Sequence, residues 1–372
     1  MRLKLFGGIA VMVMAGALTM PVFLQETASA AGRVPKFEPD PTWPKRLPKK
    51  WMLGGNGGVF VDSHDHIWIA NRPKSLQEND RFAADIPPQA DCCIPAPPIV
   101  EFDMAGNLIQ GWGGPGPGYE WPDTEHSIFV DHKDNVWIGG NSAKDTQVLK
   151  FTKNGKFVLQ IGKHGVTAGS NDNANLNQPA GIAVYAKTNE VFVADGYGNR
   201  RIIVFDAETG AYKRHWGAYG KAPDDKASNA RTSKGPGPAQ FNTPHGIRIS
   251  NDGLVYVADR KNNRIQVFQI DGSYVKEGFV ERSTASKEGT TLDIAFSPDK
   301  QQQFLYVPDL PNKKVQILNR DTLEVLGFFG GRGGRGFGEF FDIHSIATDS
   351  KGNIYIGESL GQRVYRYSYK GM

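Results

Sequence analysis

Three histidines occupy one position of a repeated stretch, and that arrangement suits a metal site. The stretches read HSIFVDHKDNVWIGG from His126, FNTPHGIRISNDGLVYVADR from Phe241 and FFDIHSIATDSKGNIYIGE from Phe340. Aligned on the apolar run that follows, His126, His245 and His344 fall in register. Three imidazoles with one open position are the donor set of a catalytic zinc site, with Zn–N distances of roughly 2.0–2.1 Å. The sequence therefore predicts a zinc centre, provided that the fold brings the three together.

These stretches belong to a longer repeat of short apolar runs. Between Gln178 and Gly217 four runs follow one another, at Gly181–Tyr185, Val191–Ala194, Arg201–Phe205 and Tyr212–Trp216. Their period of two predicts half-buried strands, so each repeat predicts one four-stranded antiparallel sheet. Six copies begin near Gly57, His126, Gln178, Phe241, Thr291 and Phe340. A spacing of roughly forty to fifty residues is typical of propeller blades, and we predict an all-β, six-bladed β-propeller.

Propeller geometry would bring the histidines together. The first strand of each blade lines the central channel, and alternate blades of six stand about 120° apart. The position is histidine in the second, fourth and sixth blades, and Gly57, Ala180 or Leu292 in the others. We therefore expect the imidazoles to converge on the axis. The alternative is that the shared phase is an accident of the repeat and each histidine is packed separately.

The same topology predicts two reactive side chains at the mouth of the channel. First strands start, and second strands end, on one face, so the residues after the second strands gather there. Among them Arg72 offers a guanidinium that suits a carboxylate, and Tyr197 offers a phenol oxygen that a nearby dication would activate as a base. We take Tyr197 and Arg72 as candidate catalytic residues, against the alternative of ordinary surface turns. Asp195 and Asp259, at the same exits, are expected to cap turns.

Charge and the remaining histidines point to no second site. The formal charge of +4 is small and evenly spread, which argues against a nucleic-acid partner. The other five histidines are expected in solvated places without a metal: His64, His66 and His132 in turns between first and second strands, His164 in a connection, and His215 on an outer strand.

The N-terminal 50 residues divide into two segments. Residues 1–30 resemble an export signal, with Arg2 and Lys4 before an apolar run and the small-residue site Ala28-Ser29-Ala30. The alternative is an uncleaved anchor; we expect cleavage, and a periplasmic or secreted mature chain without a membrane span. Residues 31–50 are proline-rich. Because the sixth repeat supplies three clear strands, we expect this segment to complete the last blade, leaving residues 51–372 as the propeller.

The chain has two cysteines, and they are adjacent. Cys92 and Cys93 lie in a long insertion between Arg72 and Ile99. Export would place them in an oxidising compartment. Neighbouring Cα atoms lie about 3.8 Å apart across a trans peptide, below the usual disulfide range of roughly 4.4–6.8 Å. The sequence leaves two interpretations open, a vicinal disulfide or a pair of free or intermolecular thiols.

The repeats resemble NHL repeats, and the set of quoted stretches looks like the core of peptidyl-α-hydroxyglycine α-amidating lyase over roughly residues 51–372. The element DGYGN at Asp195 and the following PHGI at Pro244 carry the resemblance most strongly. It implies a six-bladed propeller that binds zinc through His126, His245 and His344, with Tyr197 and Arg72 as catalytic residues. The implied reaction cleaves a C-terminal hydroxyglycine into an amide and glyoxylate.

The resemblance has limits. In that family an aspartate after the third zinc histidine helps to hold a structural calcium, and here the position is Ser345, so the resemblance does not extend to calcium. A methionine and a proline before that histidine are also missing, since this chain reads FFDIH. We expect an exported zinc-dependent lyase acting on a small or peptide carbinolamide-type substrate. The alternative is a non-catalytic NHL propeller that binds a ligand or a protein partner at the same mouth.

Overall fold

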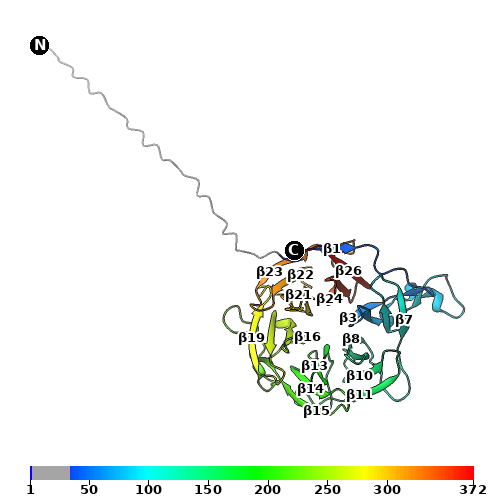
Figure 1. The fold of residues 1–372 in the computed structure, drawn as a ribbon, viewed down its shortest axis with the longest axis horizontal. Helices are drawn as coiled ribbons and strands as arrows, with labels where there is room; N and C mark the ends of the chain where they lie inside the picture. Colours follow the sequence, from blue (N-terminus) through cyan, green and yellow to red (C-terminus); the bar gives the residue numbers. More distant parts are fainter. Residues whose placement is uncertain (2–33) are drawn as a thin grey trace. The chain divides into compact units, whose positions relative to one another are not determined.

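Six antiparallel sheets of four strands stand around a central axis (Figure 1). The computed structural model describes Met1 and residues 34–372, and the predicted export signal lies outside the described residues apart from Met1. Blade I contains β3 (Gly55–Val61), β4 (Ile67–Arg72), β6 (Ile99–Phe102) and β7 (Leu108–Trp112); blade II contains β8 (Glu125–Val130), β9 (Asn135–Gly140), β10 (Gln147–Thr152) and β11 (Phe157–Gly162); blade III contains β12 (Gly181–Tyr185), β13 (Glu190–Asp195), β14 (Arg201–Asp206) and β15 (Tyr212–Trp216).

The second half of the ring repeats this order. Blade IV contains β16 (Pro244–Ile249), β17 (Val255–Asp259), β18 (Arg264–Phe268) and β19 (Tyr274–Phe279); blade V contains β20 (Ala295–Phe296), β21 (Phe304–Asp309), β22 (Lys314–Asn319) and β23 (Val325–Gly330); blade VI contains β24 (Ile343–Thr348), β25 (Ile354–Glu358), β26 (Arg363–Tyr369) and β1 (Phe37–Asp40). The four strands predicted between residues 178 and 217 agree with blade III to within one residue at each end. The predicted propeller is confirmed.

The N-terminal segment closes the ring, as predicted. Strand β1 pairs with β26 from Phe37↔Tyr369 to Asp40↔Arg366. Burial raises the pKa of Asp40, but hydrogen bonds from Thr42 and Arg366 outweigh it and lower this pKa to about 2. The ring of Phe37 packs on Tyr306 and Phe329 of blade V. The first and last described strands that belong to blades therefore share one sheet, and this pairing closes the ring.

The hydrophobic core is divided among the gaps between blades. In residues 34–372 six clusters of buried apolar side chains each join two neighbouring blades, as Phe192, Trp216 and Phe268 do between blades III and IV. One blade alone would leave both faces of its sheet in water, so the blades stabilise one another by mutual burial. The stability of each blade thus depends on its neighbours.

Around the axis the inner strands leave no room for side chains at certain positions. A Cβ on Gly57 would lie 2.4 Å from the Glu125 carbonyl oxygen and 2.8 Å from the His126 Cα. A Cβ on Gly246 would lie 2.6 Å from the Asp293 Cα. These glycines permit the close approach of neighbouring inner strands that narrows the channel.

The long insertion of blade I protrudes from the rim (Figure 1). It contains three short 3-10 turns, η1 (Pro73–Ser75), η2 (Glu78–Asp80) and η3 (Phe82–Ala84), and its return strand β5 (Ile94–Pro95) pairs in parallel with β2 (Trp51–Met52). Cys92 and Cys93 are joined there as a disulfide. Cys92 is exposed and Ile86 is almost fully exposed, so the tip of the insertion is not part of the core.

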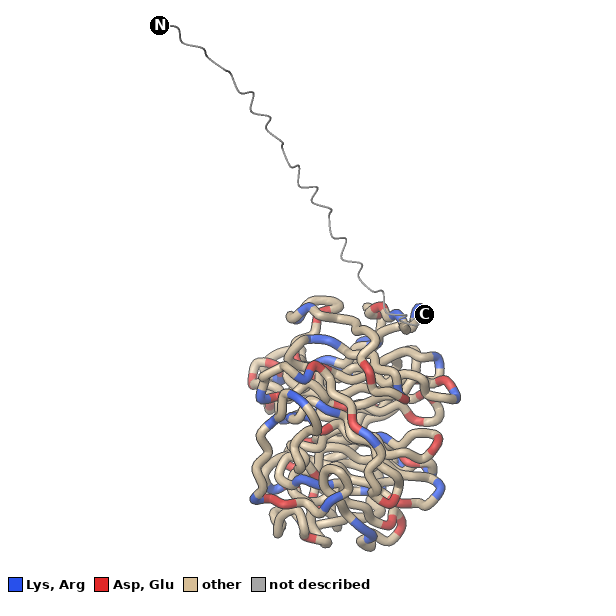
Figure 2. Tube along the Cα trace, turned by 90° about the vertical axis from the view of Figure 1, so that its left-hand side faces the viewer, with Lys and Arg blue, Asp and Glu red and all other residues tan. Residues whose placement is uncertain are grey.

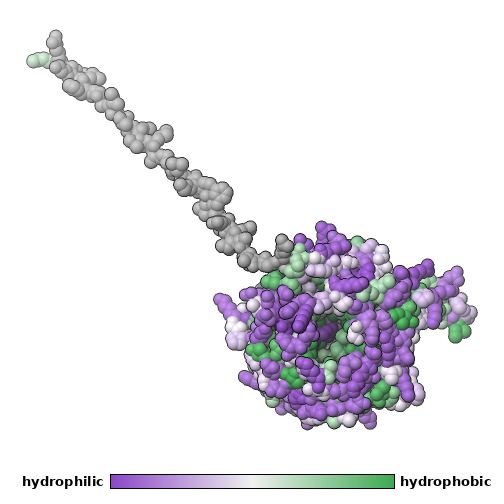
Figure 3. Space-filling model, viewed as in Figure 1, coloured by the Kyte–Doolittle hydropathy of each residue, from purple (hydrophilic) through white to green (hydrophobic). Residues whose placement is uncertain are grey.

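The surface carries charges of both signs. Lys, Arg, Asp and Glu alternate over the visible side of the ring (Figure 2), and the space-filling view shows a hydrophilic rim around a central hollow (Figure 3). None of the helices in the described part of the chain has the length and apolar character that crossing a bilayer requires.

The closing segment generates a prediction about stability. Trp43 is 4% exposed and packs on Phe102 of blade I and Tyr355 of blade VI. Trp43→Ala should lower the free energy of unfolding by about 3–5 kcal/mol, because it removes a large buried side chain between two blades. Ile86→Ala, at the exposed tip of the insertion, is the control and should leave denaturant unfolding unchanged. Equal midpoints for Trp43→Ala and the unmodified chain would contradict this account of closure.

Candidate metal centre and active-site mouth

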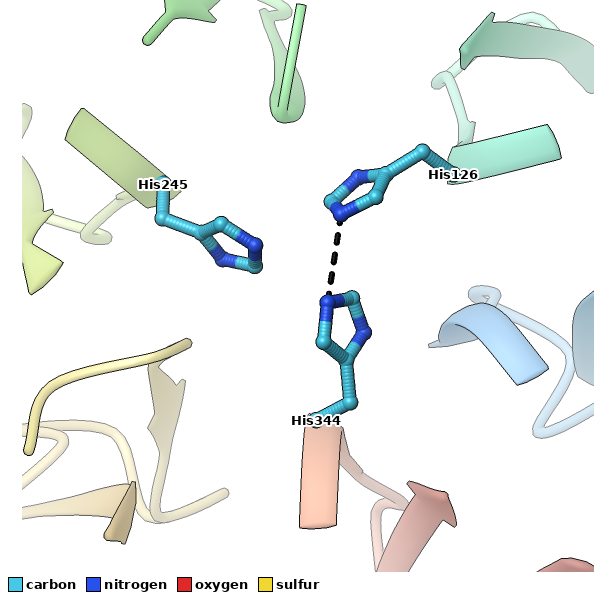
Figure 4. Close-up of side chains that lie close together, drawn as sticks. All are labelled: His126, His245 and His344. Carbon is cyan, nitrogen blue, oxygen red and sulfur yellow. Dashed lines mark hydrogen bonds between the residues drawn. The ribbon is translucent and has the colours of Figure 1, made fainter. Parts of the chain in front are cut away.

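A break in the strand register lies at each of the three histidines. The pairing of β8 with β9 shifts between Glu125 and Ser127, and the pairing of β24 with β25 shifts between Ile343 and Ser345. The pairing of β16 with β17 shifts between Pro244 and Ile247, a span that includes His245. A β-bulge redirects the side chain of its extra residue. The three imidazoles accordingly leave three inner strands and point at one another (Figure 4).

One nitrogen of each imidazole gathers with the others around the channel axis. Nε2 of His126 is 3.1 Å from Nε2 of His344, and the hydroxyl oxygen of Tyr197 is 3.0 Å from Nε2 of both His126 and His245. One nitrogen of each histidine lies within 4.8 Å of the others. Two nitrogens on a tetrahedral zinc ion stand about 3.3 Å apart, since each Zn–N bond is about 2.0–2.1 Å. The spacing of His126 and His344 is close to that value.

Backbone carbonyls orient two of the rings. Nδ1 of His126 donates to the Ala180 carbonyl at 2.9 Å, and Nδ1 of His245 donates to the Leu292 carbonyl at 2.5 Å. A neutral imidazole that donates through Nδ1 carries a lone pair on Nε2. Such carbonyl partners are the usual outer contacts of metal-binding histidines. Both acceptors occupy the repeat position that is histidine in the alternate blades.

The environment keeps the three imidazoles neutral. They are 1%, 3% and 6% exposed for His126, His245 and His344. Burial is the main cause that lowers the pKa of each well below 6.5. Neighbouring histidines lower the pKa of His126 and His344 further, and the charge of Arg72 lowers the pKa of all three. A neutral imidazole is the form that binds a metal.

The cluster holds more lone pairs than protons. Tyr197 has one hydroxyl hydrogen and lies 3.0 Å from the Nε2 atoms of both His126 and His245. If His344 donates through Nε2 to His126, its Nδ1 becomes an acceptor, and that buried Nδ1 has no hydrogen-bond partner among the described residues. A cation between the Nε2 atoms would accept the lone pair of each of them, and His344 would then carry its proton on Nδ1, beside the backbone of Gly57. The residues therefore fit a bound metal ion, and three imidazoles are a set that zinc takes.

Above the histidines lies a cavity of about 420 Å³ at the mouth of the channel. Residues after the second strands of all six blades line it: Arg72, Asn141, Tyr197, Arg260, Leu310 and Ser359. Glu288, Asp342, His344 and Leu360 complete the lining. Both candidate catalytic residues thus share one cavity with a candidate metal ligand.

Arg72 has an unused donor in this cavity. Its Nε donates to the Glu125 carbonyl at 2.6 Å, whereas its Nη2 is buried without a hydrogen-bond partner among the described residues. Burial lowers the pKa of Arg72, and the charges of Tyr197 and Glu125 oppose that change. A guanidinium stays protonated in proteins even when its pKa falls. An unpaired buried donor on a cation is a binding point for an anionic group.

Sequence reasoning missed Arg260, which contacts Tyr197 directly. Its Nη1 donates to the Tyr197 hydroxyl oxygen at 3.0 Å, and its other nitrogens bind the Glu288 carboxylate and carbonyl at 2.5 and 2.8 Å. Aligned on Ala70 and Ala258, Arg72 and Arg260 occupy the same repeat position in blades I and IV. That shared phase is the signal that could have identified Arg260, by the argument applied to the histidines.

The two aspartates at the strand exits do more than cap turns. Asp195 accepts the backbone N–H of Asn177 and forms an ion pair of 2.9 Å with Arg201, both side chains being fully buried. Asp259 accepts the backbone N–H of Asn242 and pairs with Arg264 at 2.7 Å. Each pair ties a connection between blades to the strand exit beside it. The expectation of simple turn caps overlooked the arginine that begins each third strand.

Comparisons with known proteins agree with this architecture. A model of the NHL repeat matches residues 241–268. The chain is 28% identical over 342 residues to peptidyl-glycine alpha-amidating monooxygenase A of Xenopus laevis, which covers 89% of this chain and 33% of that protein. It is 25% identical over 362 residues to NHL repeat-containing protein 3 of Homo sapiens, covering 93% of this chain and 89% of that protein. A probable peptidyl-alpha-hydroxyglycine alpha-amidating lyase of Caenorhabditis elegans is 32% identical over 224 residues, 58% of this chain and 56% of that protein.

These matches decide the relationship. The chain is a six-bladed NHL-repeat β-propeller related to the amidating enzymes. The predicted resemblance is confirmed, although the chain spans only a third of the length of the Xenopus relative. A streptogramin B lyase structure superposes with a TM-score of 0.51 at 13% identity, covering 90% of this chain and 98% of that one, which supports the fold alone.

An ion pair between neighbouring blades IV and V lies in the channel of the NHL propeller, beside the histidines. A small cavity of about 30 Å³ there is lined by the three histidines, Arg248 and Asp293. Asp293 accepts hydrogen bonds from Arg248 and from the backbone N–H groups of Ile294 and Ile346, at 3.1, 2.8 and 3.1 Å. The hydroxyl of Ser345, the residue after His344, donates a hydrogen bond to the side-chain oxygen of Asn56. A guanidinium from blade IV thus neutralises a buried carboxylate of blade V, and Ser345 offers no carboxylate.

The other histidines lie in the predicted elements, but only His64 and His132 are exposed, and His66, His164 and His215 are half-buried. His64 and His66 lie between β3 and β4, His132 between β8 and β9, His164 between β11 and β12, and His215 on β15. His66 contacts Glu101 at 2.8 Å, but Lys153 lies 3.3 Å from the same carboxylate oxygen, so the charges are those of an ion-pair cluster.

The metal centre is testable by composition. We expect about one zinc ion per purified chain, held by the three buried imidazoles. His245→Ala should lose most of it, because two imidazoles remain where three bound the metal. His64→Ala, in an exposed turn, is the matched control and should keep the zinc of the unmodified chain. Undiminished zinc in His245→Ala by elemental analysis would rule out this centre.

Proposed function

We propose that this propeller is a zinc-dependent lyase that cleaves an N-acyl-α-hydroxyglycine into an acyl amide and glyoxylate. The main support is the position of Tyr197, whose hydroxyl oxygen lies 3.0 Å from two candidate zinc ligands in the cavity that also holds the unpaired Nη2 of Arg72. A base, a metal centre and an anion-binding point around one cavity suit a substrate that carries a hydroxyl beside a carboxylate. The lyase name of the Caenorhabditis elegans relative supports the same reaction class.

The proposed reaction needs one proton acceptor and one carboxylate clamp. When bound, zinc would lower the pKa of the substrate hydroxyl. Tyr197 accepts the hydroxyl proton, and the Nη1–H of Arg260, 3.0 Å away, stabilises the phenolate form of that acceptor. Arg72 binds the carboxylate that becomes part of glyoxylate. The C–O bond gains double-bond character as the C–N bond breaks, and the departing amide nitrogen takes up a proton.

Location and partners belong to the proposal as well. On the strength of the Ala28-Ser29-Ala30 site, we place the mature chain in the periplasm or outside the cell. Its partner would be a small or peptidic substrate. Nothing in the evenly spread charge favours nucleic acid.

The reaction is tested by offering an N-acyl-α-hydroxyglycine to the purified chain and measuring glyoxylate. Tyr197→Phe removes one hydroxyl, so turnover should fall by about 10²–10⁴, the usual contribution of one acid–base group. Zinc content and thermal unfolding should not change. If Tyr197→Phe keeps full activity, another group is the base. If the unmodified chain binds zinc but releases no glyoxylate, the lyase proposal is wrong, and ligand binding without catalysis becomes the better account.

Arg72→Lys separates binding from proton transfer. Lysine keeps the charge but loses the planar pair of N–H donors, and it cannot keep the contact to the Glu125 carbonyl while it binds a carboxylate. We expect kcat/KM to fall by about 10–100-fold, with KM raised. An unchanged KM would show that the substrate carboxylate binds elsewhere.

A further inference from the structure

The mouth cavity contains an acidic group that the proposed chemistry does not use. Asp342 precedes His344 by two residues and lines the same cavity as Arg72 and Tyr197. Oδ2 of Asp342 accepts hydrogen bonds from the Ser359 hydroxyl and from the Leu360 N–H. No hydrogen bond to Oδ1 and no ion pair of Asp342 is found among residues 34–372. One carboxylate oxygen is thus fixed to the protein and the other is left for a ligand.

The charges of the cavity sort into one pair and two single groups. Arg260 is bound to Glu288 at 2.5 Å, so these two charges compensate each other. Arg72 forms no ion pair within the described ranges, and its Nη2 has no partner there. Asp342 is near enough to raise the pKa of Arg72 against the lowering effect of burial. A free cation and a free anion therefore face one cavity without pairing directly.

Few aliphatic residues line this cavity. Its aliphatic side chains are Leu310 and Leu360. The polar part of the lining includes two arginines, three side chains that are acids or amides, and one phenol. Leu360 is 65% exposed, at the outer edge. An apolar acyl chain would bury the carboxylate of Asp342 without a partner, which costs free energy. A group with a positive charge would satisfy it with a charge-assisted hydrogen bond.

We propose that the substrate is dipolar: its carboxylate binds Arg72, and a cationic group on its acyl part binds Asp342. This substrate class, an N-acyl-α-hydroxyglycine with an ammonium or guanidinium on the acyl chain, rests on the proposed lyase function. Asp342 is then a residue that determines specificity and takes no part in bond cleavage.

Matched acyl groups test the charge preference. We would compare the 6-aminohexanoyl, heptanoyl and 5-carboxypentanoyl derivatives of α-hydroxyglycine, which have similar lengths and carry a positive, no or a negative charge. With the unmodified chain kcat/KM for glyoxylate release should be about 10–100-fold higher for the cationic substrate than for the neutral one, the value of one hydrogen bond between charged groups. Asp342→Asn should abolish that preference and leave the neutral substrate within about threefold of the unmodified chain. Asp321→Asn removes the same charge from a turn where the carboxylate is 84% exposed, and should keep the preference.

A binding measurement separates this inference from the lyase proposal. The corresponding glycine conjugates lack the hydroxyl and cannot react, so calorimetry with 6-aminohexanoylglycine and heptanoylglycine reports recognition alone. Tighter binding of the cationic conjugate that disappears in Asp342→Asn supports the inference even if no glyoxylate is formed from any substrate, in which case only the lyase proposal fails. Equal binding of both conjugates, or an equal loss for all three substrates in Asp342→Asn, would overturn the inference.

Discussion

The close packing of six inner strands around one axis is the constraint on which this molecule depends. Three imidazoles that lie 119 and 99 residues apart along the chain come together because the channel is narrow. It is narrow because neighbouring strands touch backbone to backbone at Gly57 and Gly246. The bulges at the histidines work within the same limit, since each turns one side chain inward without widening the ring. The histidine cluster is thus a property of the whole ring and of no single blade.

Buried ion pairs add a second constraint to the packing of the inner strands. The ion pairs Asp195–Arg201 and Asp259–Arg264 lie out of contact with water, and each also holds the backbone of a connection that leads to the mouth. Removing one partner of such a pair would leave an uncompensated buried charge. These buried ion pairs therefore fix the connections beside the side chains that face the cavity. A preorganised site needs such fixed supports.

The sequence predicts the fold well because its information is periodic. Strand period, turn residues and a shared histidine phase are enough to derive the propeller, the closing strand and the convergence of His126, His245 and His344. What remained hidden depends on contacts between segments far apart in the chain. The bulges cannot be predicted from the alternation of apolar and polar residues. The contact of Arg260 with Tyr197 joins two blades. The free carboxylate oxygen of Asp342 depends on the positions of Ser359 and Leu360, which bind the other oxygen. Blade V has the shortest inner strand, β20.

The strand that closes the ring also sets an order of events. Because Phe37 pairs with Tyr369, the last blade cannot form until nearly all of the described chain is available. Pairing over so long a separation has a large loop-closure entropy, and such contacts form slowly. Until blade VI has formed, the faces of blades I and V that pack against it lack a neighbour, and His344 cannot join the other two histidines. A metal ion that needs all three imidazoles would therefore bind only after the ring has closed.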